Sequence, residues 1–228
     1  MKAADEIVFS EAGVVVARSD HRVHAAFADA HRVLSFAPLR GGFRTSRAVA
    51  IVGVRNADLP IGVDPLALLA DRVASLGDDV VGMMTSRSLH AVDVVSVEHA
   101  EARAFVVATA GLSNAVLVGD TPGELRGWGT INLIARLDRP VSDEALVELV
   151  SVVTEARTVA VLEAGVTSRR SDAIASGTGT DCVAVAAPVG DAAAIYAGKH
   201  SAIGHVVGAA ALAACRAAIV RWKREVLG

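Results

Sequence analysis

The sequence predicts a single α+β domain, residues 1–228, in which a mixed, largely antiparallel β-sheet is layered with about three α-helices. Three observations lead to this prediction. A chain of 228 residues can bury one sizeable core, and nothing in its composition requires a second domain. Short apolar runs separated by turns dominate residues 7–54, which is typical of an antiparallel meander. Later strands alternate irregularly with helices, so a strict βαβ repeat is not expected.

The first half contains the meander and one well-delimited helix. Asp64 is a typical N-cap, Pro65 suits the first helical position, and Gly77 follows the last apolar residue of the helix. Buried strands are expected at residues 80–84 and 103–109, and the segment between them is ambiguous between strand and helix. The meander strands are expected at Gly13–Ala17, Val23–Phe27 and Ala48–Val54.

The second half is predicted to contain a long loop, two strands and two helices. Residues 113–129 hold four glycines and one proline, and a loop of this length in a compact domain often belongs to a binding site. Strands are expected at 130–137 and 182–187. Ser142 caps the second helix. The last helix, from residue 201 to about 226, has a slim face of small residues that can lie against the sheet or against a partner, so a homo-oligomer is compatible with it.

Composition and charge exclude several classes of function. A net charge of −3 and an aromatic content of 4% leave neither a basic field nor stacking platforms for nucleic acid. The longest apolar run, residues 206–215, is shorter than the roughly 18 residues that a membrane span needs. Acidic residues within the segment Met1–Glu6 do not fit a signal peptide, so we expect a cytoplasmic protein.

Metal and thiol chemistry are not expected either. The seven histidines show no pair at the spacing of metal ligands on a helix, so no metal or other cofactor is required by the sequence. Cys182 and Cys215 form no Cys-x-x-Cys pair, and we assign both to packing.

The run Gly177-Thr178-Gly179-Thr180-Asp181 is the strongest candidate for chemistry. Glycines let the backbone approach a ligand, and the hydroxyls and carboxylate supply donors, acceptors and a candidate base. Taken alone, the run could equally close a hairpin.

Other short segments occur with this run in a characteristic order, and together they resemble the adenosylcobinamide amidohydrolase family. The resemblance covers most of the chain from about Leu34 to Gly208. It implies a corrinoid salvage enzyme that hydrolyses the aminopropanol amide of adenosylcobinamide and releases adenosylcobyric acid, so the corrinoid is a substrate. A corrinoid carrier or sensor without catalysis and an amidase for another small molecule remain alternatives. The other matching segments are Pro38–Gly42, 110–115, Gly129–Asn132, 154–156 and Tyr196–His200.

Three titratable residues in these segments are candidates for proton transfer: Asp181, His200 and Glu155. If Asp181 and His200 both serve the reaction, they should converge on one cleft. Glu155 presents a conflict, because stepping about 100° per residue from Leu146 places it opposite the apolar stripe and in solvent. A catalytic role would require a helix that is buried on two sides, and both interpretations stay open.

The remaining candidates would bind and polarise the substrate. Asparagine carboxamides can bind an oxyanion or the amide arms of a corrinoid, threonine hydroxyls can bind amides or ribose, and a tryptophan offers a flat face. Thr130 has a further interpretation, since a Gly-Thr step can become an N-terminal threonine nucleophile after self-cleavage, although the chain is continuous. The predicted substrate-binding residues are Asn114, Trp128, Thr130, Asn132, Gly177, Thr178, Gly179 and Thr180.

Overall fold

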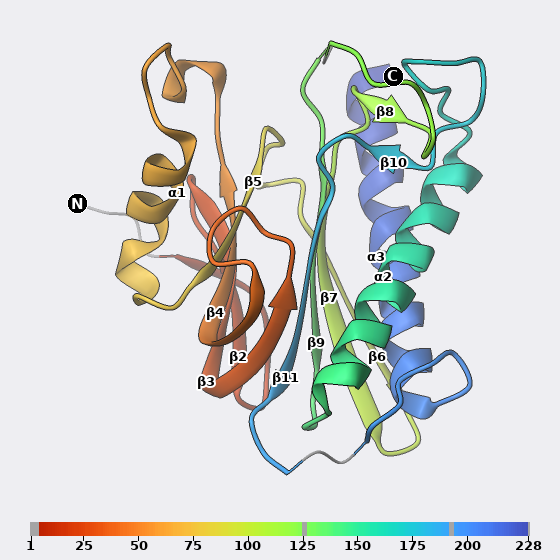
Figure 1. Cartoon of the computed structure of the whole chain (residues 1–228). Coiled ribbons are helices and arrows are strands. Elements are labelled where there is room, and N and C mark those ends of the chain that lie inside the picture. The colour runs from red at the N-terminus through yellow and green to blue at the C-terminus, as the bar shows by residue number, and fades with distance from the viewer. Residues whose placement is uncertain (1–4, 125–126, 192–193, 228) are drawn as a thin grey trace.

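The computed structural model describes residues 5–124, 127–191 and 194–227 (Figure 1). In these residues nine strands form one folded sheet, two short strands form a separate ladder, and three α-helices cover the outside. This confirms the α+β class with a mixed, largely antiparallel sheet. Residues 1–4 of the acidic N-terminal segment and residues 125 and 126 of the predicted loop lie outside the described residues.

The predicted meander is formed by four consecutive antiparallel strands. Two of them, at residues 22–35 and 42–53, extend beyond the residues that the sequence indicates. The register between these two strands shifts between Ala26 and His31, where the ribbon bends. The first half of β3 pairs with β2, its second half pairs with β11 (Cys182–Pro188), and β4 follows both halves. This ribbon therefore folds the sheet back on itself. The strands are β1 (Glu6–Glu11), β2 (Val14–Arg18), β3 (Arg22–Ser35) and β4 (Gly42–Gly53).

The rest of the sheet is built by strands from the second half of the chain. Its order continues from β3 as β11-β9-β7-β6, with β9 parallel to β11 and the other pairs antiparallel. The segment that was ambiguous in the sequence contains strand β6, and β5 extends the sheet beside β4 as a parallel partner. The strands are β5 (Val81–Thr85), β6 (Asp93–His99), β7 (Ala102–Ala110) and β9 (Ile131–Leu137).

The three helices begin where the sequence predicts. Helix α1 (Pro65–Val73) follows Asp64, whose carboxylate accepts a hydrogen bond from the N–H of Leu66 at 2.9 Å. Helix α2 (Asp143–Ala164) follows Ser142, whose hydroxyl accepts from the N–H of Ala145 at 3.2 Å. Helix α3 spans Ala202–Leu227. These caps satisfy amide groups that would otherwise lack partners at the helix ends.

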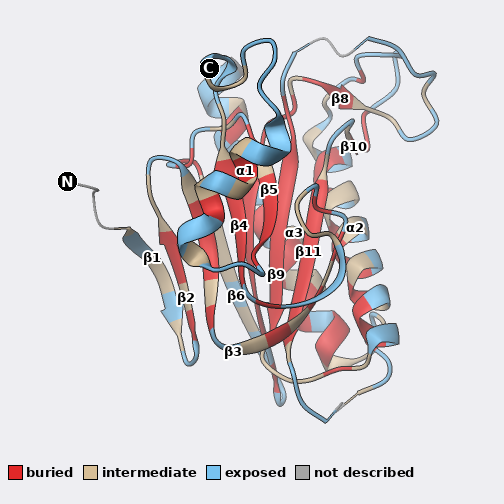
Figure 2. Ribbon diagram, turned by 60° about the vertical axis from the view of Figure 1, so that its left-hand side comes forward, coloured by how far each residue is buried: buried red, intermediate tan, exposed pale blue. Residues whose placement is uncertain are grey.

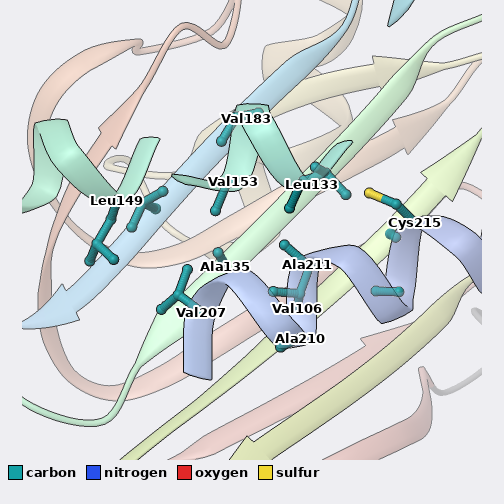
Figure 3. Packing of buried hydrophobic residues seen from close by; sticks show 14 of the residues in the cluster. Val106, Leu133, Ala135, Leu149, Val153, Val183, Val207, Ala210, Ala211 and Cys215 are labelled. Carbon is teal, nitrogen blue, oxygen red and sulfur yellow. The ribbon is translucent and has the colours of Figure 1, made fainter. Parts of the chain in front are cut away.

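Three apolar clusters separate the layers. One fills the space between the two folded halves of the sheet, and a smaller one lies between α1 and β4–β5 (Figures 1 and 2). The largest lies between α2, α3 and the outer face of β7, β9 and β11, where Val106, Leu133 and Val183 meet the helices (Figure 3). The slim face of α3 allows close packing, since a Cβ at Gly208 would lie 3.1 Å from Val152 of α2.

Helix α3 is long and apolar enough to cross a membrane by length and composition. However, 56% of its most apolar window is buried inside the protein, where it packs on β6, β7 and β9. The core helix of a globular domain has the same character, so this property of α3 is explained by its packing.

Candidate active site

One end of the folded sheet gathers most of the residues predicted to act on substrate. The strand register sets Asn132, at the start of β9, beside Cys182 of β11 and Thr109 of β7. The Nδ2 group of Asn132 also donates to the carbonyl oxygen of Met84 at 2.7 Å, which brings the end of β5 to the same place. We call this region, where β5 and β7 end and β9 and β11 begin, the upper end of the sheet; it lies at the top of Figure 1.

The carboxylate of Asp181 is the centre of a buried hydrogen-bond network at the upper end. Its side chain is 8% exposed and forms an ion pair with Arg157 of α2. It accepts hydrogen bonds from the N–H of Ile131 at 3.0 Å and from the N–H and hydroxyl of Thr178 at 2.9 and 2.6 Å. Both carboxylate oxygens are therefore engaged, and the network joins β9, α2 and the short strand β10 (Gly177–Thr178). This geometry suits a residue that positions the strand ends.

The same ion pair explains why residue 177 is a glycine. A Cβ at Gly177 would collide with the guanidinium of Arg157 and with the carboxylate of Asp181. Sequence reasoning missed Arg157, although a signal was present. Arg157 is four residues after Val153 and eight after Leu149, so it continues the buried stripe of the helix. A charged residue on such a stripe indicates a buried partner.

Two threonines hold the starts of β9 and β11 together. The hydroxyl of Thr130 donates to the carbonyl oxygen of Thr180 at 2.7 Å, and the hydroxyl of Thr180 donates to the carbonyl oxygen of Gly129 at 2.9 Å. Thr130 also lies 3.4 Å from Oδ1 of Asn132. These contacts join two of the segments that resemble the family, Gly129–Asn132 and Gly177–Asp181. Gly179 lies in the exposed turn between Thr178 and Asp181.

Two buried side-chain oxygen atoms at the upper end have no hydrogen-bond partner in the described part of the chain. They are Oδ1 of Asn114 and Oγ1 of Thr109. Asn114 Oδ1 lies against Gly129, where a Cβ would approach it to 2.5 Å. Buried polar atoms are normally hydrogen-bonded, so unsatisfied ones indicate a place where water or a ligand binds.

The described part of the long loop is fixed to the segment that leads into β10. Asp120 accepts hydrogen bonds from the Ser168 hydroxyl at 2.5 Å and from the N–H of Leu117 at 2.9 Å, and these bonds hold the pKa of Asp120 below its usual range. The loop strand β8 (Ala115–Val116) pairs with β10. Trp128, in the same loop, is 67% exposed. A large aromatic face is thus presented to solvent beside Gly129.

Glu155 and His200 do not join this cluster. The Glu155 side chain is 52% exposed and forms an ion pair with Lys199 at 2.5 Å, so it lies in solvent, as helical periodicity indicates. His200 is exposed and lies in the segment between β11 and α3. Among the contacts of the described residues, none joins His200 to Asp181 or to the groups bonded to that carboxylate. The convergence of Asp181 and His200 on one cleft stays a prediction.

Neither a cluster of metal-binding side chains nor an exposed cysteine thiol occurs in the described part of the chain. Among the described residues, no group of three or more His, Cys, Asp or Glu side chains could hold a metal ion. Cys182 and Cys215 are both buried, and burial raises the pKa of each thiol to about 12. The groups that the described residues bring together at the upper end are hydroxyl, carboxamide and guanidinium groups held by a carboxylate.

Comparison with known proteins assigns the chain to a family. The model of the adenosylcobinamide amidohydrolases matches residues 8–226. This chain belongs to that family. The match confirms the resemblance drawn from the motifs, and it supports a hydrolase at the level of the family.

Individual relatives are more distant. The adenosylcobinamide amidohydrolase of Halobacterium salinarum is 33% identical in an alignment of 166 residues that covers 66% of this chain and 65% of that protein. The chain thus matches slightly less than two thirds of the length of this relative. The crystal structure of the PH0078 protein from Pyrococcus horikoshii OT3 covers 99% of this chain and 82% of its own, with 10% identity and a TM-score of 0.42. A similarity of that size carries no argument about the site.

Proposed function

We propose that this protein hydrolyses the aminopropanol amide of adenosylcobinamide and releases adenosylcobyric acid. The proposal rests on family membership across residues 8–226 together with the hydrogen-bonding cluster at the upper end. Amide hydrolysis needs donors that stabilise the developing oxyanion and groups that orient the substrate. Asn114, Asn132 and Thr130 are the buried side chains assigned to these tasks.

In this proposal Asp181 acts as a positioning residue. Its hydrogen bonds to the N–H groups of Ile131 and Thr178 hold the strand ends in register. A corrin ring carries several amide arms, and their donors and acceptors complement the unsatisfied atoms of Asn114 and Thr109. The exposed face of Trp128 suits the flat apolar surface of a corrin or an adenine.

The direct test is turnover. Purified protein is incubated with adenosylcobinamide from about pH 5 to about pH 9, with and without a divalent cation, and the release of aminopropanol and adenosylcobyric acid is followed. Stoichiometric formation of both products supports the proposal. Binding of the corrinoid without any product would identify a carrier or sensor, and the hydrolase proposal would be abandoned.

A matched pair of variants locates the site. Asn114→Ala removes a buried carboxamide at the upper end, whereas Asn56→Ala removes an exposed one in the short 3-10 helix η1 (Asn56–Asp58), which follows β4. We expect the first to lower kcat/KM by about tenfold to a hundredfold and the second to leave it unchanged. Equal activity of both variants would place the site elsewhere.

A further inference from the structure

Arg87 crosses the upper end of the sheet, although nothing in its sequence context singles it out. It lies in the turn after β5, and its backbone N–H donates to the hydroxyl of Thr85 at 3.1 Å. Its side chain, 14% exposed, passes over Gly111 at the end of β7, where a Cβ would lie 2.9 Å from Cδ of Arg87. The missing side chain at residue 111 is therefore what allows the guanidinium to lie across the strand end.

The guanidinium of Arg87 has unused hydrogen-bonding capacity. In the described part of the chain its contact is an ion pair between Nη2 and Oε2 of Glu225 at 2.5 Å, while Nε is buried without a partner. Glu225 lies in the last turn of α3, where the helix dipole disfavours a carboxylate. The ion pair with Arg87 offsets this unfavourable position of Glu225. A buried N–H that lacks an acceptor is costly, so a ligand oxygen would be bound favourably.

The neighbours of Arg87 connect it to the rest of the site. Gly111 lies against Gly129, since a Cβ on Gly111 would be 3.7 Å from the Cα of Gly129. Gly129 in turn contacts the unsatisfied Oδ1 of Asn114. The guanidinium of Arg87 thus lies beside Gly111, and the carboxamide of Asn114 lies beside Gly129. The two glycines between them have no side chains to cover the backbone.

We propose that Arg87 contacts the substrate and binds the oxygen of the amide carbonyl that becomes the product carboxylate. This inference rests on the proposed function. In the hydrolysis a water oxygen forms a bond to the carbonyl carbon, the C–N bond breaks, and the amine leaves as an ammonium ion while the acid loses its proton. Negative charge develops on the bound oxygen and stays in the carboxylate. Arginine binds a carboxylate oxygen more strongly than it binds the carbonyl oxygen of a neutral amide, because both partners of the hydrogen bonds are then charged.

The test compares the binding of product and substrate in matched variants. Arg87→Gln and Glu225→Gln both break the same ion pair, but only the first removes the guanidinium. Dissociation constants for adenosylcobyric acid and for adenosylcobinamide are measured by calorimetric titration of each variant and of Arg87→Lys. We expect Arg87→Gln to weaken binding of the acid about tenfold to a hundredfold more than binding of the amide. Glu225→Gln should bind the acid at least as tightly as the wild type, and Arg87→Lys should retain part of the preference.

Each outcome decides the matter. Equal weakening of both ligands by Arg87→Gln, or equal effects of Arg87→Gln and Glu225→Gln, would show that the ion pair only stabilises the fold and would overturn the assignment. If the wild type binds both corrinoids and Arg87→Gln leaves the ratio of the two dissociation constants unchanged, the role of Arg87 is overturned while the proposed function stands. A wild type that binds neither corrinoid would overturn the proposed function and this inference with it.

Discussion

Replacing Asp181 with asparagine should destabilise the fold strongly, because the change removes the charge that pairs with Arg157. The new amide nitrogen would also face groups that donate hydrogen bonds, the N–H groups of Ile131 and Thr178 among them. Removing one partner of a buried ion pair costs about 3–5 kcal/mol. In a chain of 228 residues each kcal/mol lowers the Tm by about 2–4 °C, so we expect a decrease of about 6–20 °C.

Urea and thermal unfolding followed by circular dichroism measure this effect. Asp172→Asn, an exposed position in the segment before β10, is the matched control and should leave stability unchanged. Arg157→Met should also lower the free energy of unfolding. Because Arg157 and Asp181 interact directly, the decrease in the double variant should be smaller than the sum of the two single decreases by at least about 1 kcal/mol. A free energy of unfolding for Asp181→Asn within about 1 kcal/mol of the wild type would refute the positioning role.

Three further predictions concern residues that take no part in the hydrogen bonds of this network. His200→Ala and Glu155→Gln should retain turnover within a few fold, measured with adenosylcobinamide, because both side chains are exposed and outside the cluster; a loss of about 10²-fold or more would contradict this. Burial lowers the pKa of His24 and His31 to about 4, so the unfolded chain binds more protons between pH 4 and 6.5. The free energy of unfolding should thus fall as the pH is lowered through this window, by at most about 1.4 kcal/mol per pH unit for each histidine, and a flat urea-unfolding profile would refute it. Both cysteine thiols should resist alkylation at neutral pH in the native state and react after unfolding, as followed by mass spectrometry.

Much of the fold could be predicted because its signals are local. The caps at Asp64 and Ser142 depend on neighbouring residues, and they mark the starts of α1 and α2 correctly. The glycine at residue 77 ends a short 3-10 turn that follows α1, which itself ends at Val73. The bend in β3 could not be predicted, since it depends on pairing with β11 across more than a hundred residues. The strand β6 remained ambiguous for a similar reason, because its pairing with β7 rather than its own pattern decides its conformation.

The candidate site was predictable where polar residues cluster in short segments. Thr130, Asn132 and Thr180 were proposed because they lie in segments that resemble the family, and the structure brings them together at the starts of β9 and β11. Arg87 and Arg157 could not be found in this way, because each reaches the site from an element whose position is set by tertiary packing. His200 is a different case, since it lies in a family-like segment but is exposed and makes no contact with the cluster among the described residues.

The bent ribbon of β3 and β4 also bears on how the chain folds. The meander can form as soon as the first 53 residues are available, but the second half of β3 then has a free edge toward the place that β11 will occupy. The hydroxyl of Ser35 bonds to the carbonyl oxygen of Val183, 148 residues later, and contacts of such separation form late and slow folding. Until β11 is inserted, that edge can pair with another chain. A growing polypeptide of this family is therefore most vulnerable to aggregation in the interval between synthesis of its meander and synthesis of its last strand.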